Sequence, residues 1–131
     1  MALHVVDHPV ITHKMNILRN KDTKTQEFRS VVNEITLLLS YEATRDLAVH
    51  DCKVETPITK MNSKTLSGND FVICPILRAG LGMVHGMLSV FPEARLAHIG
   101  LRRDEETAKP MFYYQNIPGQ LENSTVIVVD P

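Results

Sequence analysis

The segment Pro75–Met83, with the sequence Pro-Ile-Leu-Arg-Ala-Gly-Leu-Gly-Met, places an arginine and two glycines after an apolar run. Backbone N–H groups at the start of a helix favour an anion, and glycines let a ligand approach the backbone closely. The guanidinium of Arg78 could also grip phosphate oxygens in bidentate fashion. The composition therefore suits phosphate binding, although a solvated arginine beside turn glycines has the same local sequence.

Two further groups of residues could take part in chemistry. Arg102 and Arg103 precede Asp104, Glu105 and Glu106, and a charge run of this kind usually forms a solvated loop. Asp130 follows a β-branched run and would stand at the carboxyl end of a strand, where open α/β sheets bind ligands. A helix cap or a turn residue is the alternative interpretation of this aspartate.

Other catalytic chemistries find little support in the sequence. The histidines lack a metal-binding spacing with nearby cysteines or acids, so we expect them to be structural or exposed and predict no protein metal site. The histidines are His4, His8, His13, His50, His85 and His98. Neither a nucleophile elbow around a serine nor a Walker-type Gly-Lys-Ser string is present, which argues against hydrolase and P-loop functions.

Length and composition indicate one folded domain over residues 1–131, with 44% hydrophobic residues. The 14 basic and 15 acidic side chains leave a formal charge of −1, so we expect no nucleic-acid or membrane partner. No apolar stretch approaches the roughly 20 residues of a membrane helix, and no signal peptide is recognisable. Cys52 and Cys74 resemble neither a disulfide framework nor a zinc site, which favours the cytoplasm.

Apolar periodicity predicts two helices in the first third of the chain. The first begins near Pro9 with Asp7 as its cap, and it carries an apolar face of Ile11, Met15 and Leu18. The second follows threonines and extends from Thr25 to about Leu47 with a long apolar stripe.

Strands and one further helix are expected after this helical region. Pro57 interrupts residues 52–64, which favours irregular edge strands, and a loop containing Asn62 and Ser63 should follow. The remaining elements are a core strand Phe71–Cys74 closed by Pro75, a helix through Met83 to Val90, extended segments Arg95–Leu101 and Met111–Tyr114, and a last strand Thr125–Val129. This order indicates an α/β layer architecture.

The last strand, Thr125–Val129, is apolar at nearly every position and therefore suits a parallel strand buried on both faces. Leaving it uncovered would cost roughly 1.5 to 3 kcal/mol for each exposed side chain. The predicted helices cover the sheet incompletely. We therefore expect either further chain after Pro131 or another subunit to complete the core.

Several strings together resemble the uracil phosphoribosyltransferase family. The most specific are Ile76–Gly82, Ile-Leu-Arg-Ala-Gly-Leu-Gly, and Arg103–Thr107, Arg-Asp-Glu-Glu-Thr. The others, in family-like order and separation, are His8-Pro9, Phe28-Arg29, Leu39–Thr44 and Val128–Pro131. The resemblance spans the whole chain.

This resemblance implies a type I phosphoribosyltransferase-like α/β fold, with a parallel sheet and flanking helices, incomplete at the carboxyl end. It implies the transfer of phosphoribosyl from PRPP to uracil, giving UMP and pyrophosphate in pyrimidine salvage. By position, Arg78 and Arg103 would contact the phosphates of PRPP, while Asp130 and Pro131 would open the loop that holds its 5-phosphate and ribose. Magnesium would be held through the substrate phosphates. A homo-oligomer and, in some members, activation by GTP are also implied.

The sequence departs from the family pattern in two ways. Arg102 stands where the family commonly has an aromatic residue, which leaves open which guanidinium reaches the substrate. The Gly- and Thr-containing phosphate loop and the uracil-reading Gly-Asp string of the family lie outside these residues. We therefore expect little or no activity from the 131-residue chain. The alternative function is that of a non-catalytic, shortened or regulatory relative that binds phosphate ligands or pairs with intact subunits.

Overall fold

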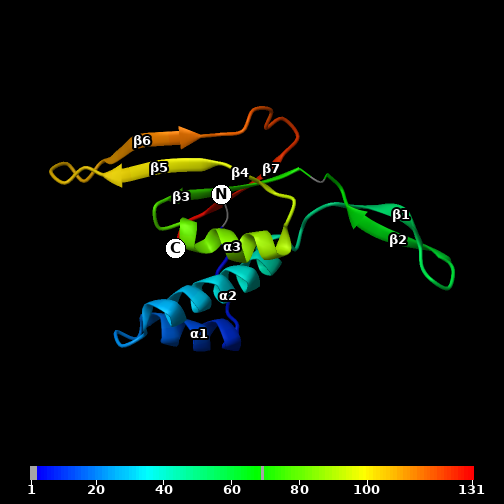
Figure 1. The fold of residues 1–131 in the computed structure, drawn as a ribbon, viewed down its shortest axis with the longest axis horizontal. Helices are drawn as coiled ribbons and strands as arrows, with labels where there is room; N and C mark the ends of the chain where they lie inside the picture. Colours follow the sequence, from blue (N-terminus) through cyan, green and yellow to red (C-terminus); the bar gives the residue numbers. More distant parts are fainter. Residues whose placement is uncertain (1–2, 69) are drawn as a thin grey trace.

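The computed structural model describes residues 3–68 and 70–131 (Figure 1). It combines helices with a mixed, partly parallel sheet in an α/β architecture, as expected from the sequence. In chain order they are α1 Pro9–Arg19, α2 Thr25–Ala43, β1 Val49–Glu55, β2 Lys60–Leu66, β3 Phe71–Leu77, α3 Leu81–Val90, β4 Arg95–Leu96, β5 His98–Arg103, β6 Pro110–Asn116 and β7 Thr125–Val129. No helix in these two ranges has the length and apolar character needed to cross a membrane.

Both predicted amino-terminal helices are present, but the cap of the first and the last residue of the second differ from the prediction. His8, rather than Asp7, caps α1: its Nδ1 accepts a hydrogen bond from the backbone N–H of Val10, and Pro9 occupies the first turn. Proline suits this position because the missing N–H would have no helical partner. Helix α2 ends at Ala43 and not near Leu47, because the chain turns at Thr44, whose hydroxyl donates to the carbonyl of Ser40.

Strands β1 and β2 form a regular antiparallel hairpin that projects from the rest of the molecule (Figure 1). The expectation of irregular strands here was wrong, because Pro57 lies in the connecting turn and does not interrupt a strand. The hydroxyl of Thr56 closes that turn by accepting the backbone N–H groups of Ile58 and Thr59. Asn62 and Ser63, expected in a loop, belong to β2.

Strand β3 lies at the centre of the main sheet. It is parallel to β7 on one side and to β4 and β5 on the other, and β6 joins antiparallel to β5. Contrary to expectation, Pro75 does not close β3, which continues to Leu77. Pairing with β4 covers Val72 and Ile73, and pairing with β5 covers Ile76 and Leu77, so proline falls where that side of the ladder is interrupted.

The single strand expected over Arg95–Leu101 is divided at Ala97 into β4 and β5. The backbone N–H of Ala97 still donates to the carbonyl of Ile73, so the segment stays attached to β3 at the break. The extended segment expected at Met111–Tyr114 is longer than predicted and forms β6. Its pairing with β5 makes the sheet mixed, with one antiparallel strand beside the parallel ones.

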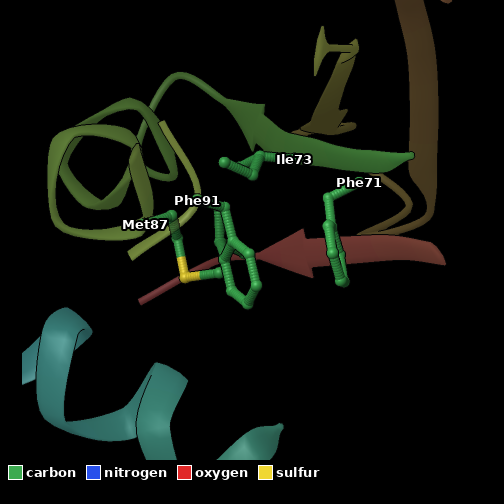
Figure 2. Packing of buried hydrophobic residues seen from close by; sticks show 5 residues of the cluster. Phe71, Ile73, Met87 and Phe91 are labelled. Carbon is green, nitrogen blue, oxygen red and sulfur yellow. The ribbon is translucent and has the colours of Figure 1, made fainter. Parts of the chain in front are cut away.

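The main core lies between β3, β7 and α3. It contains Phe71, Ile73, Met87, Phe91 and Val129, and Figure 2 shows the side chains of the first four meeting between strand and helix. The rings of Phe71 and Phe91 are 4.4 Å apart at their centroids, in a tilted arrangement. Such aromatic contacts add to the stabilisation from burial.

A smaller cluster lies on the opposite face of β3 and contains Val72, Cys74 and Ala97. Burial raises the pKa of the Cys74 thiol because the charged thiolate loses its hydration there. Cys74 and Cys52 are both free thiols, as the sequence indicated. The cluster shows that β3 is apolar on both faces, in keeping with a central parallel strand.

Strand β7 is not buried on both faces in this chain, in keeping with the incomplete cover of the sheet that the sequence indicated. Val129 is 5% exposed, but Val126 and Val128 are 45% and 60% exposed. The physical reason is that β7 pairs only with β3 and forms an edge of the sheet. A run of β-branched residues predicts a strand and its apolar character, but its neighbours decide how much of it is buried.

Candidate functional site

The turn between β3 and α3 places Arg78 at the carboxyl end of the central strand. The backbone N–H of Gly80 donates to the carbonyl of Ile76, 2.9 Å away, and α3 begins directly after this turn at Leu81. The peptide bond between Leu77 and Arg78 is cis. The strand, turn and helix predicted from the sequence therefore occur in that order, with the helix amino terminus beside Arg78.

Gly80 allows this turn to lie directly against the end of β7. A Cβ atom on Gly80 would be 2.4 Å from the carbonyl oxygen of Val129 and 2.7 Å from the backbone nitrogen of Ile76. Both neighbours are backbone atoms, which a small side-chain adjustment cannot relieve. The glycine is thus required for close approach, and it brings the Arg78 turn next to the strand that precedes Asp130.

Three of the four predicted site residues border one open hollow of about 440 Å³. Arg78 reaches it from the end of β3, Arg103 from the end of β5, and Asp130 from the end of β7. All three side chains are exposed to solvent. Two guanidiniums and one carboxylate therefore meet at the carboxyl edge of the parallel strands, the edge where open α/β sheets bind ligands.

Pro131, the fourth predicted residue, does not line this hollow. It borders a separate apolar hollow of about 250 Å³ next to α1 and α2, with Met15, Leu18 and Leu39 among the lining residues. Asp130 borders both hollows. The Asp-Pro pair thus lies between the hollow that contains the arginines and a hollow with an almost wholly apolar lining.

Arg102 and Arg103 both border the hollow that contains Arg78, and both border a second one of about 320 Å³ beside Glu105 and Glu106. The second hollow is more polar because acidic residues line it. Because both guanidiniums border both hollows, a binding measurement has to show which of the two arginines contacts the ligand.

The turn after β5 is held by Asp104. One carboxylate oxygen accepts hydrogen bonds from the backbone N–H and the hydroxyl of Thr107, each 2.8 Å long, and from the N–H of Glu106. The Thr107 N–H bond, followed by the hydroxyl bond, holds the pKa of Asp104 below its ordinary value. A charge run that the sequence suggests is merely solvated is therefore an ordered turn beside Arg103.

The sequence did not indicate Ala108 and Pro110 as site residues, yet both line the hollow that contains Arg78. These residues follow the acidic turn and carry no polar group that marks a site. They reach the hollow because β6 folds back on β5, with Arg103 opposite Pro110 in the register. The Arg-Asp-Glu-Glu-Thr string locates the turn, but no local signal identifies the residues that return from it.

The described residues 3–68 and 70–131 contain no group of three or more His, Cys, Asp or Glu side chains placed to hold a metal ion. Two of the histidines have local roles. His8 caps α1, and the Nδ1 atom of His50 lies 3.3 Å from the Ser67 hydroxyl, joining β1 to the residue after β2. Both contacts lie within the fold, which is consistent with the expectation that the histidines are structural or exposed.

A sequence profile of the family described as "Uracil phosphoribosyltransferase" matches residues 5–131. Among curated proteins, the uracil phosphoribosyltransferase of Finegoldia magna is 54% identical over 127 residues, covering 97% of this chain and 61% of the relative. That of Ligilactobacillus salivarius is 52% identical with the same coverage, and that of Staphylococcus aureus strain Newman is 50% identical over 129 residues. The chain thus spans about 61% of the length of these relatives.

The fold is similar to a solved structure as well. The structure of the AQ2163 protein from Aquifex aeolicus has a TM-score of 0.86 and 35% sequence identity, covering 96% of this chain and 60% of that one. The strand, turn and helix around Arg78, the hollow at the strand ends and the profile match over residues 5–131 all agree. The chain therefore belongs to the uracil phosphoribosyltransferase family.

Proposed function

We propose that this chain supplies the PRPP-binding part of a uracil phosphoribosyltransferase, which converts uracil and PRPP to UMP and pyrophosphate. The observation that carries the proposal is the single hollow bordered by Arg78, Arg103 and Asp130. Family membership supports the reaction, because the curated relatives carry the name of this activity. Residues 1–131 form one phosphoribosyltransferase-like domain in this proposal.

The proposed chemistry places its main electrostatic demand on the leaving group. Uracil N1 forms a bond to the anomeric carbon while the bond from that carbon to pyrophosphate breaks, so negative charge gathers on pyrophosphate. Arg78 and Arg103 stabilise that charge with forked donors that match phosphate oxygens. The N–H groups of Leu81, Gly82 and Met83 at the start of α3 donate to the backbone carbonyls of Arg78, Ala79 and Gly80, so the guanidiniums are the main donors to the anion in this proposal.

Asp130 has a different role in this proposal. Its carboxylate accepts hydrogen bonds from ribose hydroxyls or from water on a magnesium ion. One carboxylate at the edge of the hollow suits Mg²⁺, which commonly takes one or two carboxylates together with substrate phosphates and water. Mg²⁺ supplies charge neutralisation of the pyrophosphate when it is bound. Pro131 borders the apolar hollow beside α1 and α2.

Titration calorimetry with PRPP and Mg²⁺ tests the proposed site. We expect Arg78→Ala and Arg103→Ala each to weaken PRPP binding by roughly 10-fold or more, since each removes a charge-assisted contact worth about 1.5 to 3 kcal/mol. Arg102→Ala distinguishes the two neighbouring guanidiniums, because it should weaken binding less than Arg103→Ala. Arg19→Ala, at the end of α1, is the matched control for loss of a positive charge.

Equal binding by wild type, Arg78→Ala and Arg103→Ala would contradict the proposed site. Formation of labelled UMP is measured in the same samples. PRPP binding without UMP formation is expected both for the PRPP-binding part of the enzyme and for the alternative, a non-catalytic relative that retains anion binding, whereas UMP formation would exclude the alternative. The 61% coverage of the relatives is the observation that favours keeping this alternative.

We further propose a homo-oligomer in the cytoplasm, with GTP as an effector. Exposed aromatic side chains on β6 support subunit contacts: Phe112 is 55% exposed and Tyr113 is 49% exposed. The two free cysteines support a reducing compartment. Light scattering with and without GTP tests both the subunit number and its response to the nucleotide, and a monomer unaffected by GTP would contradict both.

A further inference from the structure

The hollow bordered by Arg78 and Asp130 also contains both arginines at the end of β5. Arg102 and Arg103 are consecutive residues of that strand, and both line the hollow of about 440 Å³. Three guanidiniums and one carboxylate are therefore the charged groups of its lining, an excess of two positive charges. The whole chain has a formal charge of −1, so this excess is a local feature of the strand ends.

The acidic side chains of the turn after β5 do not balance this charge inside the hollow. Asp104, Glu105 and Glu106 border the neighbouring hollow of about 320 Å³, and the lining of the larger hollow does not include them. One carboxylate oxygen of Asp104 already accepts hydrogen bonds from its own turn. The positive charge of the larger hollow is therefore available to a ligand.

The arginines of the hollow also have no ion-pair partner in the part of the chain that the structure describes. Arg95 shows the contrast, since its guanidinium is held by the carboxylate of Asp70. Arg78, Arg102 and Arg103 form no such pair among the described residues, and all three are exposed to solvent. Their forked N–H donors are thus available to an anion.

Arg102 and Arg103 approach the hollow from opposite faces of the sheet. Arg102 lies opposite Met111 in the register between β5 and β6. Arg103, the next residue, lies opposite Pro110, so both belong to the paired part of the strand. Because successive side chains of a strand point to opposite faces, the two guanidiniums reach the hollow around different sides of the strand end. This arrangement suits two linked anionic groups better than one small anion.

We infer that Arg102 is a specificity-determining residue of this hollow and forms, with Arg103, a clamp that selects ligands with linked phosphoryl groups over single phosphates. Arg78 and Arg103 supply the general attraction for phosphate, and Arg102 adds forked hydrogen bonds to a second phosphoryl group. This role of Arg102 rests on the proposed function, because it adds a residue to the hollow that is assigned there to PRPP.

Titration calorimetry with pyrophosphate and with inorganic phosphate, in a metal-free buffer at one ionic strength, measures this selectivity. Without a metal ion, the protein alone supplies the positive charge. Arg102→Gln should weaken pyrophosphate binding by about 3- to 10-fold and leave phosphate binding within about 2-fold of wild type. Arg103→Gln should weaken the binding of both anions, because it removes a donor that both contact.

Arg102→Lys separates the effect of the charge from that of the forked donors. Lysine keeps the positive charge without the planar fork, so this variant should recover only part of the pyrophosphate affinity that Arg102→Gln loses. Arg19→Gln, which replaces an exposed arginine of α1, is the matched control and should bind both anions as wild type does. Because Arg102 is exposed, its replacement should leave the melting temperature unchanged.

Arginine side-chain signals in nuclear magnetic resonance spectra provide a second measurement, which reports direct contact. The Nε–H signal of Arg102, assigned by its absence in Arg102→Gln, should shift more with pyrophosphate than with phosphate at equal saturation. An Arg102 signal that responds to neither anion would overturn the role of this residue.

The calorimetric outcomes distinguish the clamp from the proposed site as a whole. Unchanged pyrophosphate affinity in Arg102→Gln, or an equal loss of affinity for both anions, would overturn the clamp. Losses in Arg78→Ala and Arg103→Ala would still support the proposed site in that case. A wild-type chain that binds neither anion would contradict the clamp and the proposed site together.

Discussion

Arg95 and Asp70 form a two-point ion pair that joins the start of β4 to the residue before β3. The Nε atom of Arg95 donates to Oδ1 of Asp70 over 2.9 Å, and the Nη2 atom donates to Oδ2 over 2.5 Å. The same guanidinium donates to the backbone carbonyls of Gly119 and Gln120, and Ser124 contacts the Asp70 carboxylate. The cluster therefore attaches the segment before β7 to the rest of the sheet.

Replacing Arg95 should loosen the segment that leads into β7. Arg95→Ala removes the donors for two carbonyls as well as the ion pair, so we expect a lower melting temperature and faster amide exchange at residues 119–125. Arg95→Lys should recover only part of the loss, because an ammonium group lacks the planar fork. Arg29→Ala, an exposed residue of α2, is the control. Unchanged exchange in Arg95→Ala would contradict this role.

The same pair predicts a pH dependence of stability. Hydrogen bonds from Arg95, and then from Ser124, lower the pKa of Asp70 from its ordinary value. A carboxylate with a lower pKa in the folded state stabilises the fold above its unfolded pKa of about 3.9 and loses that contribution as the pH falls through the folded value. The stability difference between wild type and Asp70→Asn should therefore be constant near neutral pH and shrink below about pH 4.

Melting temperatures measured across the acid range check this expectation, with Asp46→Asn as the control for an exposed aspartate. Asp46→Asn should follow the wild-type curve. A difference between wild type and Asp70→Asn that persists unchanged below pH 3, well under the ordinary value of about 3.9, is the result that would count against it.

Replacement by alanine should have opposite effects on the free energy of unfolding at Gly86 and at Gly82 of α3. A Cβ on Gly86 would be 2.7 Å from the carbonyl oxygen of Asn33 and 2.8 Å from the Cβ of Thr36, whereas one on Gly82 would be 3.6 Å from Val32. Gly86→Ala should separate α2 from α3 and lower the free energy of unfolding by about 1 to 3 kcal/mol. Gly82→Ala should leave it unchanged or raise it by up to about 1 kcal/mol.

Urea unfolding of the two variants side by side measures both effects, because the helix and the residue type are shared. The prediction is wrong if Gly86→Ala is as stable as Gly82→Ala. Such a result would mean that α2 and α3 can shift apart without cost, which is inconsistent with the buried side chains of Thr36 and Met87.

Asp104 provides a test of the turn beside Arg103. Asp104→Ala removes the acceptor for Thr107 and Glu106, so the β5–β6 turn should become more mobile while the core stays intact. We expect weaker binding of pyrophosphate, by about 3- to 10-fold for a net loss of roughly 1 kcal/mol of positioning hydrogen bonds, and little change in melting temperature. Glu105→Ala is the control within the same turn.

Calorimetry with pyrophosphate and Mg²⁺, together with amide exchange at residues 104–109, distinguishes positioning from folding. An Asp104→Ala variant that binds pyrophosphate like wild type despite faster exchange in the turn would show that the turn does not position Arg103.

The sequence indicated the part of the site that local interactions specify. The apolar run of β3, the glycine-containing turn with Arg78 and the start of α3 follow one another between Phe71 and Leu81, and the structure confirms their order. Glycine and proline act on their own backbone, so a short string reveals the turn. The family resemblance, based on several strings at once, is also confirmed by the profile match.

Boundaries that depend on neighbouring strands were predicted less well. Pro75 breaks an isolated strand pattern, but β3 continues through it because the ladder on that side is interrupted there. Pro57 similarly led to the prediction of irregular strands. It lies in the turn between β1 and β2, which form a regular hairpin. In both cases proline stands at a position where no partner strand needs its backbone N–H as a donor.

By itself, the sequence determined the α/β class, the strand–turn–helix around Arg78 and the family, since each depends on residues close together or on several strings in order. Only the tertiary structure decided that Arg103 and Asp130 border the same hollow as Arg78 and that Pro131 does not. It also decided that β7 lies at an edge of the sheet and that Val126 and Val128 are the valines of this strand that stay exposed. These relationships depend on strand order and register, which arise from long-range pairing and are not encoded in any local pattern.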